Sequence, residues 1–237
     1  MFLLSYKKDE WIFRAFHKRI FRAPTLNDLY YTLVGNTKLN PEYTSQWDAG
    51  IDYKGKRFHF AVDGYYNHID DKIVAIPMKC QFRWSMVNFG KVKSYGASFS
   101  GGYNQDWGKF SLAANANYTY QIDKDYTMPS DPEYKNYIPY SPMHSGSVIL
   151  DLGYDSYSLC TSFLYTGERF ALVSNNADDL LGDWYTIDLK LNKRFKIGKH
   201  VLQTTLECNN LADSRHEVVK RYPMPGRNWK CTVKFEL

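Results

Sequence analysis

Apolar residues recur at every second position along most of this chain, over stretches of about ten residues or more. A period of two predicts β-strands, since successive side chains of a strand point to opposite faces. Strands of this length exceed the globular norm of about five or six residues, and about 9–11 tilted residues are enough to cross a bilayer. The alternation therefore favours an all-β fold, an antiparallel transmembrane β-barrel. The clearest examples are residues 46–54, 57–67, 110–121, 185–192 and 229–237.

The aromatic content supports the same class. Tyr, Phe and Trp make up 17% of the 237 residues, and membrane barrels place such rings in girdles at both interfaces. No apolar run approaches the roughly 18 residues that a transmembrane helix needs. The net charge of +5 is small and scattered, which argues against a nucleic-acid partner.

The pattern predicts about eleven strands joined by alternately short and long connections. Short hairpin turns on one side and long loops on the other are typical of outer-membrane barrels, whose turns are periplasmic and whose loops are extracellular. One helical turn is expected in the first long connection, at residues 26–31. The expected strands are residues 2–8, 11–22, 44–54, 57–69, 89–104, 109–122, 144–154, 157–167, 184–196, 200–210 and 227–237, and the long connections are 23–43, 70–88, 123–143, 168–183 and 211–226.

Four short motifs resemble those of TonB-dependent outer-membrane receptors. Residues 21–30 (FRAPTLNDLY) resemble the FRAPTxxxLY segment of that family, and residues 35–42 resemble the GNxxLxPE that follows it. Near the end, residues 207–211 resemble the strand that finishes in NNL, and residues 222–227 (YPMPGR) resemble the YPxPGR before the last strand. From the residues alone, the prolines in these motifs have structural roles, because proline cannot donate to a β-ladder.

The resemblance implies a receptor of the Gram-negative outer membrane. Such barrels have about 22 strands around a plug, so residues 1–237 would form the C-terminal portion, with the plug domain and N-terminal strands outside the chain. Implied partners are outer-membrane lipid, the plug, TonB through the N-terminal part, and a small-molecule ligand. An iron chelate, haem or cobalamin is expected as the ligand, with no cofactor and no enzymatic activity. The alternative is a smaller self-standing barrel with a structural or adhesive role.

Polar residues at alternate positions are expected to face the lumen. A plugged lumen would use them to hydrogen-bond the plug, although each of them could equally be a solvated residue of the barrel wall. The candidates are Asp48, Asp52, His59, Asp63, Asn115, Asn117, Asp188 and Lys190.

Aromatic and basic residues in two long connections are candidate ligand contacts. Rings and cations suit an anionic or ring-bearing ligand through stacking and cation–π contacts, and the alternative is packing of the loops against themselves. The candidates are Lys79, Phe82, Arg83, Trp84, Tyr126 and Tyr137.

Cysteines and histidines give weaker indications. No cysteine pair has the CxxC spacing of a zinc site, so no metal site is predicted. By alternation Cys160 faces the lumen, whereas Cys208 and Cys231 face lipid. A barrel hydrolase would need a nucleophile, a base and an acid together; His144 with Ser145, or His59 with Asp63, are the pairs that could be placed in that role, and no nucleophile motif supports either.

Overall fold

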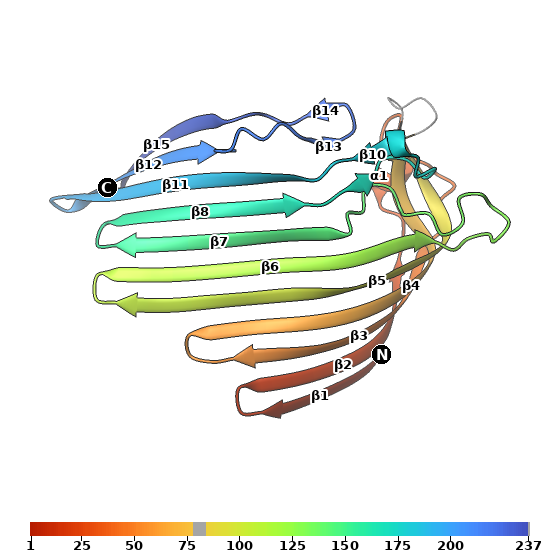
Figure 1. Cartoon of the computed structure of the whole chain (residues 1–237), viewed down its shortest axis with the longest axis horizontal. Helices are drawn as coiled ribbons and strands as arrows, with labels where there is room; N and C mark the ends of the chain where they lie inside the picture. The colour runs from red at the N-terminus through yellow and green to blue at the C-terminus, as the bar shows by residue number, and fades with distance from the viewer. Residues whose placement is uncertain (78–83, 237) are drawn as a thin grey trace.

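Eleven antiparallel strands form one curved sheet in the computed structural model, which describes residues 1–77 and 84–236 (Figure 1). Each strand pairs with its neighbours in the order β1-β2-β3-β4-β5-β6-β7-β8-β11-β12-β15, and within the described residues the edge strands β1 and β15 do not pair with each other. The sheet is therefore an open shell. Its strands are β1 (Phe2–Lys8), β2 (Trp11–Arg22), β3 (Glu42–Lys54), β4 (Phe58–Pro77), β5 (Trp84–Trp107), β6 (Phe110–Asp125), β7 (His144–Tyr154), β8 (Tyr157–Thr166), β11 (Trp184–Ile197), β12 (His200–Asn209) and β15 (Asn228–Glu236).

The remaining elements are short and lie in the long connections, all at one end of the sheet (Figure 1). We call this the loop end and the opposite end, with its tight hairpins, the turn end. The expected helical turn is confirmed as α1. In the described residues we find no helix with the length and apolarity that a membrane crossing demands. The short elements are α1 (Leu26–Tyr30), β9 (Arg169–Phe170), η1 (Ala177–Asp179), β10 (Leu180–Leu181), β13 (Glu217–Val219) and β14 (Tyr222–Pro223).

All eleven expected strands are present, but the long loop expected at residues 70–88 is wrong. β4 continues to Pro77 and β5 starts at Trp84, so the two strands pair well beyond the rest of the sheet. The β-branched residues of the segment 73–76 favour an extended backbone, and they pair with residues 85–88. The polar run at residues 70–72 resembles the start of a loop, yet the Asn88 amide fixes it by donating to the Asp71 carbonyl oxygen at 2.7 Å.

Four of the five hairpins at the turn end have two-residue turns, and the β3–β4 turn has three residues, 55–57. Asp9, Gly108, Asp155 and Gly198 have φ values of 52°, 61°, 53° and 63°. Glycine and aspartate adopt this left-handed region more readily than other residues, and the tight turns that match strand twist require it. The turn residues therefore explain the register of four hairpins directly.

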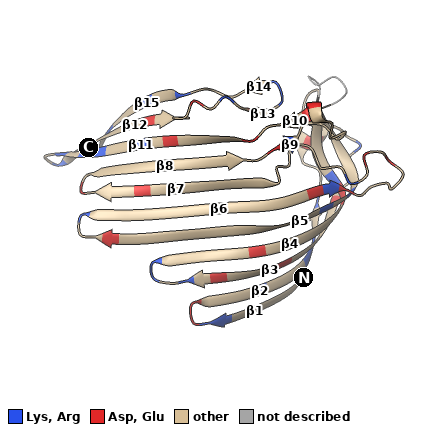
Figure 2. Ribbon diagram, viewed as in Figure 1, with Lys and Arg blue, Asp and Glu red and all other residues tan. Residues whose placement is uncertain are grey.

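The register places the apolar and the polar positions on opposite faces of the sheet. Phe13, Ile51, Val62, Phe99 and Tyr118 are successive partners across β2 to β6. This outer face is exposed along its length, as a lipid-facing surface is. Charged residues gather at the turns and in the loops, with scattered positions along the strands (Figure 2).

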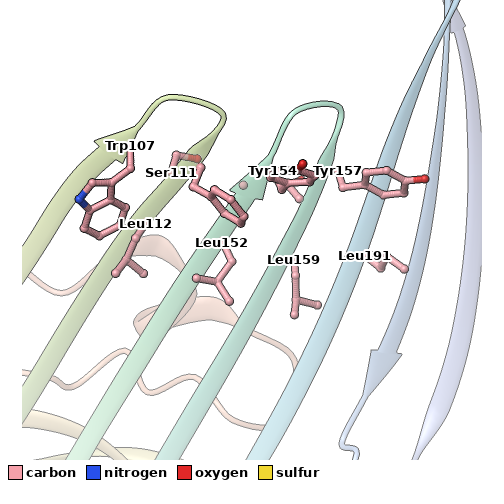
Figure 3. A pocket seen from close by; sticks show the side chains of 11 residues that line it. Trp107, Ser111, Leu112, Leu152, Tyr154, Tyr157, Leu159 and Leu191 are labelled. Atoms are coloured by element: carbon pink, nitrogen blue, oxygen red, sulfur yellow. The ribbon is translucent and has the colours of Figure 1, made fainter.

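Rings and leucines form two tiers on the outer face at the turn end. Figure 3 shows Trp107, Tyr154 and Tyr157 beside the hairpins and leucines one step further along the strands. Together they line an apolar groove of about 450 Å³. Aromatic rings at the boundary with aliphatic residues behind them match a membrane interface. The leucines are Leu112, Leu152, Leu159 and Leu191.

The buried core lies under the loops at the loop end rather than within the wall. Ile138, from the β6–β7 connection, packs on Ile69, Phe89 and Val92 of β4 and β5. Val92 is fully buried. Because these loops fold over one face of the sheet, that face is the inner one, opposite the apolar outer face.

Candidate functional site

The eight polar residues predicted to face the lumen all lie on the inner face. In antiparallel ladders directly paired residues share a face, and the register assigns each of the eight to the side opposite the outer-face row. The eight residues therefore share one face, and their contact with a plug stays a prediction. The structure further shows which of these residues meet one another.

Arg14 joins two of the predicted carboxylates. Its Nη1 lies 2.6 Å from Asp52 Oδ2, its Nε donates to Asp63 Oδ1 at 3.2 Å, and its Nη2 also donates to that oxygen. One guanidinium on β2 thereby fixes carboxylates on β3 and β4. Arg14 is not among the residues predicted from the sequence, although Arg14, Lys18 and Arg22 recur at every fourth position of β2, and that spacing is the signal that could have indicated it.

Gly50 makes this contact possible. Arg14, Gly50 and Asp63 are successive partners across β2, β3 and β4. A Cβ at Gly50 would overlap Asp63 Oδ1 and approach the Val62 carbonyl oxygen to 3.1 Å. The absent side chain leaves a notch through which Arg14 reaches a carboxylate two strands away. Gly102 has a similar position between His59 and Asn115, and a Cβ there would overlap the His59 ring and lie 2.7 Å from Asn115 Oδ1.

The inner face near β12 holds a second set of polar contacts. Asp188 Oδ1 accepts the Asn210 backbone N–H at 2.7 Å, which ties the β12–β15 connection to β11. Glu207 lies 3.2 Å from Lys190 Nζ and 3.3 Å from Lys230 Nζ. Both predicted residues on β11 thus have partners within the wall.

Two buried acceptor oxygens on the inner face accept no hydrogen bond from any residue that the structure describes. Asn67, Ser94 and Asp123 are successive partners across β4, β5 and β6. Asp123 is 8% exposed, and its Oδ2 accepts from the Ser141 hydroxyl. Within the described part of the chain, Asp123 Oδ1 and Asn67 Oδ1 accept no hydrogen bond. A buried acceptor without a donor costs free energy. These two oxygens could therefore accept hydrogen bonds from a donor outside the described residues.

A network of charges anchors the first long connection at the loop end. Arg22 Nη2 lies 3.2 Å from Asp28 Oδ2, and Arg22 Nη1 lies 3.5 Å from Glu42 Oε2. Thr25 and Asp28 form a capping box at the start of α1. The Thr25 backbone N–H, aided by the Thr25 hydroxyl and Arg22, lowers the pKa of Asp28 from its ordinary value. The motif residues 21–42 therefore act structurally, joining the start and the end of this connection.

The described aromatic candidates pack against other loop residues. The ring of Tyr126 lies 5.5 Å from that of Tyr134, and the ring of Tyr137 lies 6.1 Å from that of Phe170. Trp84 belongs to β5 instead of a loop, and its ring lies 5.5 Å from Tyr140. Ligand contact by these residues stays a prediction. The candidates Lys79, Phe82 and Arg83 lie outside the described residues.

An apolar recess of about 530 Å³ opens beside Trp84. Its other walls come from β13, β14 and the residue after them, because the extended β4–β5 hairpin rises toward these elements at the loop end (Figure 1). The lining residues are Trp84, Val218, Val219, Tyr222 and Met224. A concave apolar surface with aromatic walls is typical of small-molecule sites.

Arg169 fixes the wall of this recess. The side chain is 4% exposed, and its guanidinium donates to the carbonyl oxygens of Gly182 (3.0 Å), Val218 (3.3 Å) and Glu217. Burial lowers the pKa of Arg169 from its usual value. The guanidinium fork thus binds the β8–β11 connection to β13. This role could not be predicted from the sequence, because no residue near Arg169 marks its side chain as buried.

The cysteines and histidines do not assemble into a reactive centre within the described residues. Cys160, Cys208 and Cys231 are free thiols that face as predicted. No group of three or more His, Cys, Asp or Glu residues in residues 1–77 and 84–236 is placed to hold a metal ion. His144 lies on the outer face, where it contacts the Tyr118 hydroxyl, whereas Ser145 lies on the inner face. That pair is therefore no catalytic dyad.

The family model and the relatives that match this chain all describe the same class of protein. The family model described as "TonB dependent receptor-like, beta-barrel" matches residues 2–211. The vitamin B12 transporter BtuB of Vibrio vulnificus (strain YJ016) is 23% identical over 220 residues, which cover 91% of this chain and 33% of that protein. This chain therefore spans about a third of the length of that relative.

Solved structures resemble the whole open sheet. The unliganded ferric citrate transporter FecA has a TM-score of 0.73 at 15% identity, covering 96% of this chain and 36% of that one. The copper transporter OprC has a TM-score of 0.72 at 16% identity, covering 98% and 38%. At these identities the likeness concerns the fold.

Proposed function

This chain belongs to the family of TonB-dependent receptor β-barrels of the Gram-negative outer membrane, and from that premise we propose that it forms part of the wall of a receptor for energy-coupled uptake of a scarce ligand. The family consists of receptors and transporters. We propose an iron chelate, haem or cobalamin as the ligand class, in keeping with relatives described as vitamin B12 and ferric citrate transporters. In this proposal the chain has no enzymatic activity.

The observation that carries the proposal is the inner face. A buried acceptor needs a donor to offset the cost of its desolvation. The row Asn67–Ser94–Asp123 presents two such acceptors. We propose that donors from a plug domain, outside these 237 residues, complete this row. The plug then moves when TonB acts on it, and the wall remains fixed.

The wall's own charges hold it rigid while the plug moves. Arg14 fixes Asp52 and Asp63, and Glu207 fixes Lys190 and Lys230. These paired groups are already satisfied, so they contribute less to plug contact than the unpaired acceptors do. The plug-facing role predicted from the sequence therefore fits the candidates without an ion pair among the described residues better than Asp52, Asp63 and Lys190.

The recess beside Trp84 is the proposed ligand contact of this part of the receptor. Its apolar, aromatic walls suit the hydrocarbon or ring surface of a chelate or a corrin, and Arg169 holds the recess in shape. The recess lies at the loop end, which is extracellular in this family of barrels.

Uptake by the intact receptor tests the proposal. Cells producing the full-length receptor are supplied with radiolabelled cobalamin or a radiolabelled ferric chelate, with and without TonB. Trp84→Ala should weaken binding of the transported ligand about tenfold, which corresponds to the loss of one large aromatic contact. Trp107→Ala, at the outer face of the turn end, is the matched control and should leave uptake unchanged. Uptake that persists without TonB, or that is unaffected by Trp84→Ala, would contradict the proposal.

A further inference from the structure

A row of basic residues crosses the outer face near the loop end. Arg19, Ser45, His68, Lys93 and Lys124 are successive cross-strand partners on β2, β3, β4, β5 and β6. Directly paired residues have Cβ atoms about 5 Å apart. We call Arg19, His68, Lys93 and Lys124 the basic row. All four are on the face that carries the apolar band, away from the lumen.

Three of the four members of the basic row have no ion-pair partner among the residues that the structure describes. Lys93 and Lys124 are paired directly opposite each other, and like charges in that position are destabilising. Within the described residues, the only ion pair of the row joins His68 Nε2 to Asp70 Oδ1 at 3.6 Å. Arg19, Lys93 and Lys124 form no ion pair with any described residue. An external anion beside the row would relieve this repulsion.

The position of the row coincides with the upper edge of the apolar band. One step toward the turn end, Trp47, Tyr66 and Tyr95 are successive partners and form an aromatic tier. On β6 the outer-face positions 110–122 precede Lys124, and such a stretch rises about 30 Å at a tilt of about 40°. This height matches the hydrocarbon thickness of a bilayer. The basic row therefore lies at the headgroup level of the outer leaflet.

Aromatic rings hold two of the ammonium groups in place. Lys93 Nζ lies 4.4 Å from the centroid of the Tyr126 ring, and Lys124 Nζ lies 4.6 Å from that of Tyr137. Cation–π contacts of this kind orient a lysine without neutralising its charge. Two rings predicted as ligand contacts from the sequence thus position cations on the outer face.

We propose that the basic row is a binding site for the phosphate groups of a phosphorylated glycolipid of the outer leaflet. The cations are spaced along one line at headgroup depth, so a headgroup with two phosphates can contact several of them at once. Its acyl chains would lie against the aromatic tier and the apolar band below. Charge complementarity identifies this occupant, since uncharged lipids offer the row no anion and free phosphate gains nothing from the apolar surface.

Native mass spectrometry of the intact receptor in detergent tests the site. The probes are lipid A with both phosphates, dephosphorylated lipid A, phosphatidylglycerol and inorganic phosphate. Bis-phosphorylated lipid A should bind tightest, and Lys93→Gln with Lys124→Gln should weaken it tenfold or more, about the effect of losing charge-assisted hydrogen bonds. Lys93→Arg with Lys124→Arg keeps the charges and should retain binding of lipid A. This variant separates the effect of losing charge from an effect of substitution on folding.

The chain offers a matched control at the opposite membrane boundary. Lys193 Nζ lies 3.3 Å from the centroid of the Tyr157 ring, on the outer face near the turn end. Lys193→Gln removes a similar ring-held cation and should leave lipid A binding unchanged. Equal binding of dephosphorylated lipid A, equal binding of phosphatidylglycerol or inorganic phosphate, unchanged affinity in the double Gln variant, or an equal loss in Lys193→Gln would each overturn the proposal. Ligand uptake is a separate readout, so failure here leaves the transport proposal standing.

Discussion

Gly50→Ala is expected to break the contact between Arg14 and Asp63 without changing a charge. A Cβ at position 50 would overlap Asp63 Oδ1, so the carboxylate must withdraw by more than about 1 Å to reach ordinary van der Waals separation. Arg14 Nε and Asp63 Oδ1 are 3.2 Å apart. A displacement of that size removes the hydrogen bonds between these two residues.

The expected cost follows from the exposure of the partners. Charge-assisted hydrogen bonds contribute about 1.5–3 kcal/mol each, but the side chains of Arg14 and Asp63 are 33% and 20% exposed, and solvent screening reduces the loss to about 1–2 kcal/mol in total. Replacing glycine by alanine also restricts the unfolded chain, which returns about 0.4–1 kcal/mol. We therefore expect a net destabilisation of about 1 kcal/mol.

Guanidinium unfolding of the intact receptor, followed by tryptophan fluorescence, measures this difference in free energy. Gly64→Ala is the matched control, because Gly64 lies in the neighbouring strand β4 and a Cβ there would meet its nearest atom, the Ala49 carbonyl oxygen, at 4.0 Å. Gly64→Ala should be neutral or slightly stabilising.

The decisive comparison repeats Gly50→Ala in an Asp63→Ala background. With no carboxylate to displace, the substitution should cost nothing. If Gly50→Ala destabilises the receptor equally in both backgrounds, the cause is the backbone near Val62 rather than the ion pair, and the reasoning is refuted.

Two further predictions concern the loop end. Hydrogen bonds and Arg22 lower the folded-state pKa of Asp28. The contribution of Asp28 to stability is therefore present above the ordinary carboxyl pKa of about 3.9 and is lost as pH falls through the lowered value. Pepsin cleavage within residues 23–41 should increase only well below pH 4, whereas cleavage of the Asp28→Asn variant should not show this transition. Arg169→Lys removes the fork that contacts the Gly182 and Val218 carbonyl oxygens, so amide hydrogen exchange in β13 should accelerate about tenfold or more, and unchanged exchange there would contradict the anchoring role.

The period of two predicts the strands because lipid and lumen impose opposite polarities on alternate residues. It fails at residues 70–88, where β4 and β5 extend past the basic row and no lipid enforces the alternation. Just before and just after this segment, the inner-face residues Ile69 and Val92 are apolar because the β6–β7 connection covers them through Ile138. The local polar run therefore predicts a loop, although β4 continues to Pro77 and β5 starts at Trp84.

The sequence pattern predicts which face of the sheet each polar residue occupies, but it does not predict which residues contact one another. Parity along one strand assigns Asp52 and Asp63 to the lumen, whereas their link through Arg14 depends on the register of three strands. Arg14 itself is hard to recognise because Ile12 and Phe16 share its face. Cross-strand pairs such as Lys93 with Lys124 have the same dependence, so the basic row becomes visible only once the strands are aligned.

The linear strand order has a consequence for assembly. Every strand of the large sheet pairs only with the strand that precedes or follows it among the eleven, and residues 23–41 form the longest connection between partners. Loop-closure entropy grows slowly with length, and local contacts favour rapid folding. The sheet can therefore grow one hairpin at a time, each new strand templated by the edge before it. Within these eleven strands no pairing is long-range, so closure of the wall through the open edges of β1 and β15 is the step that local contacts do not supply.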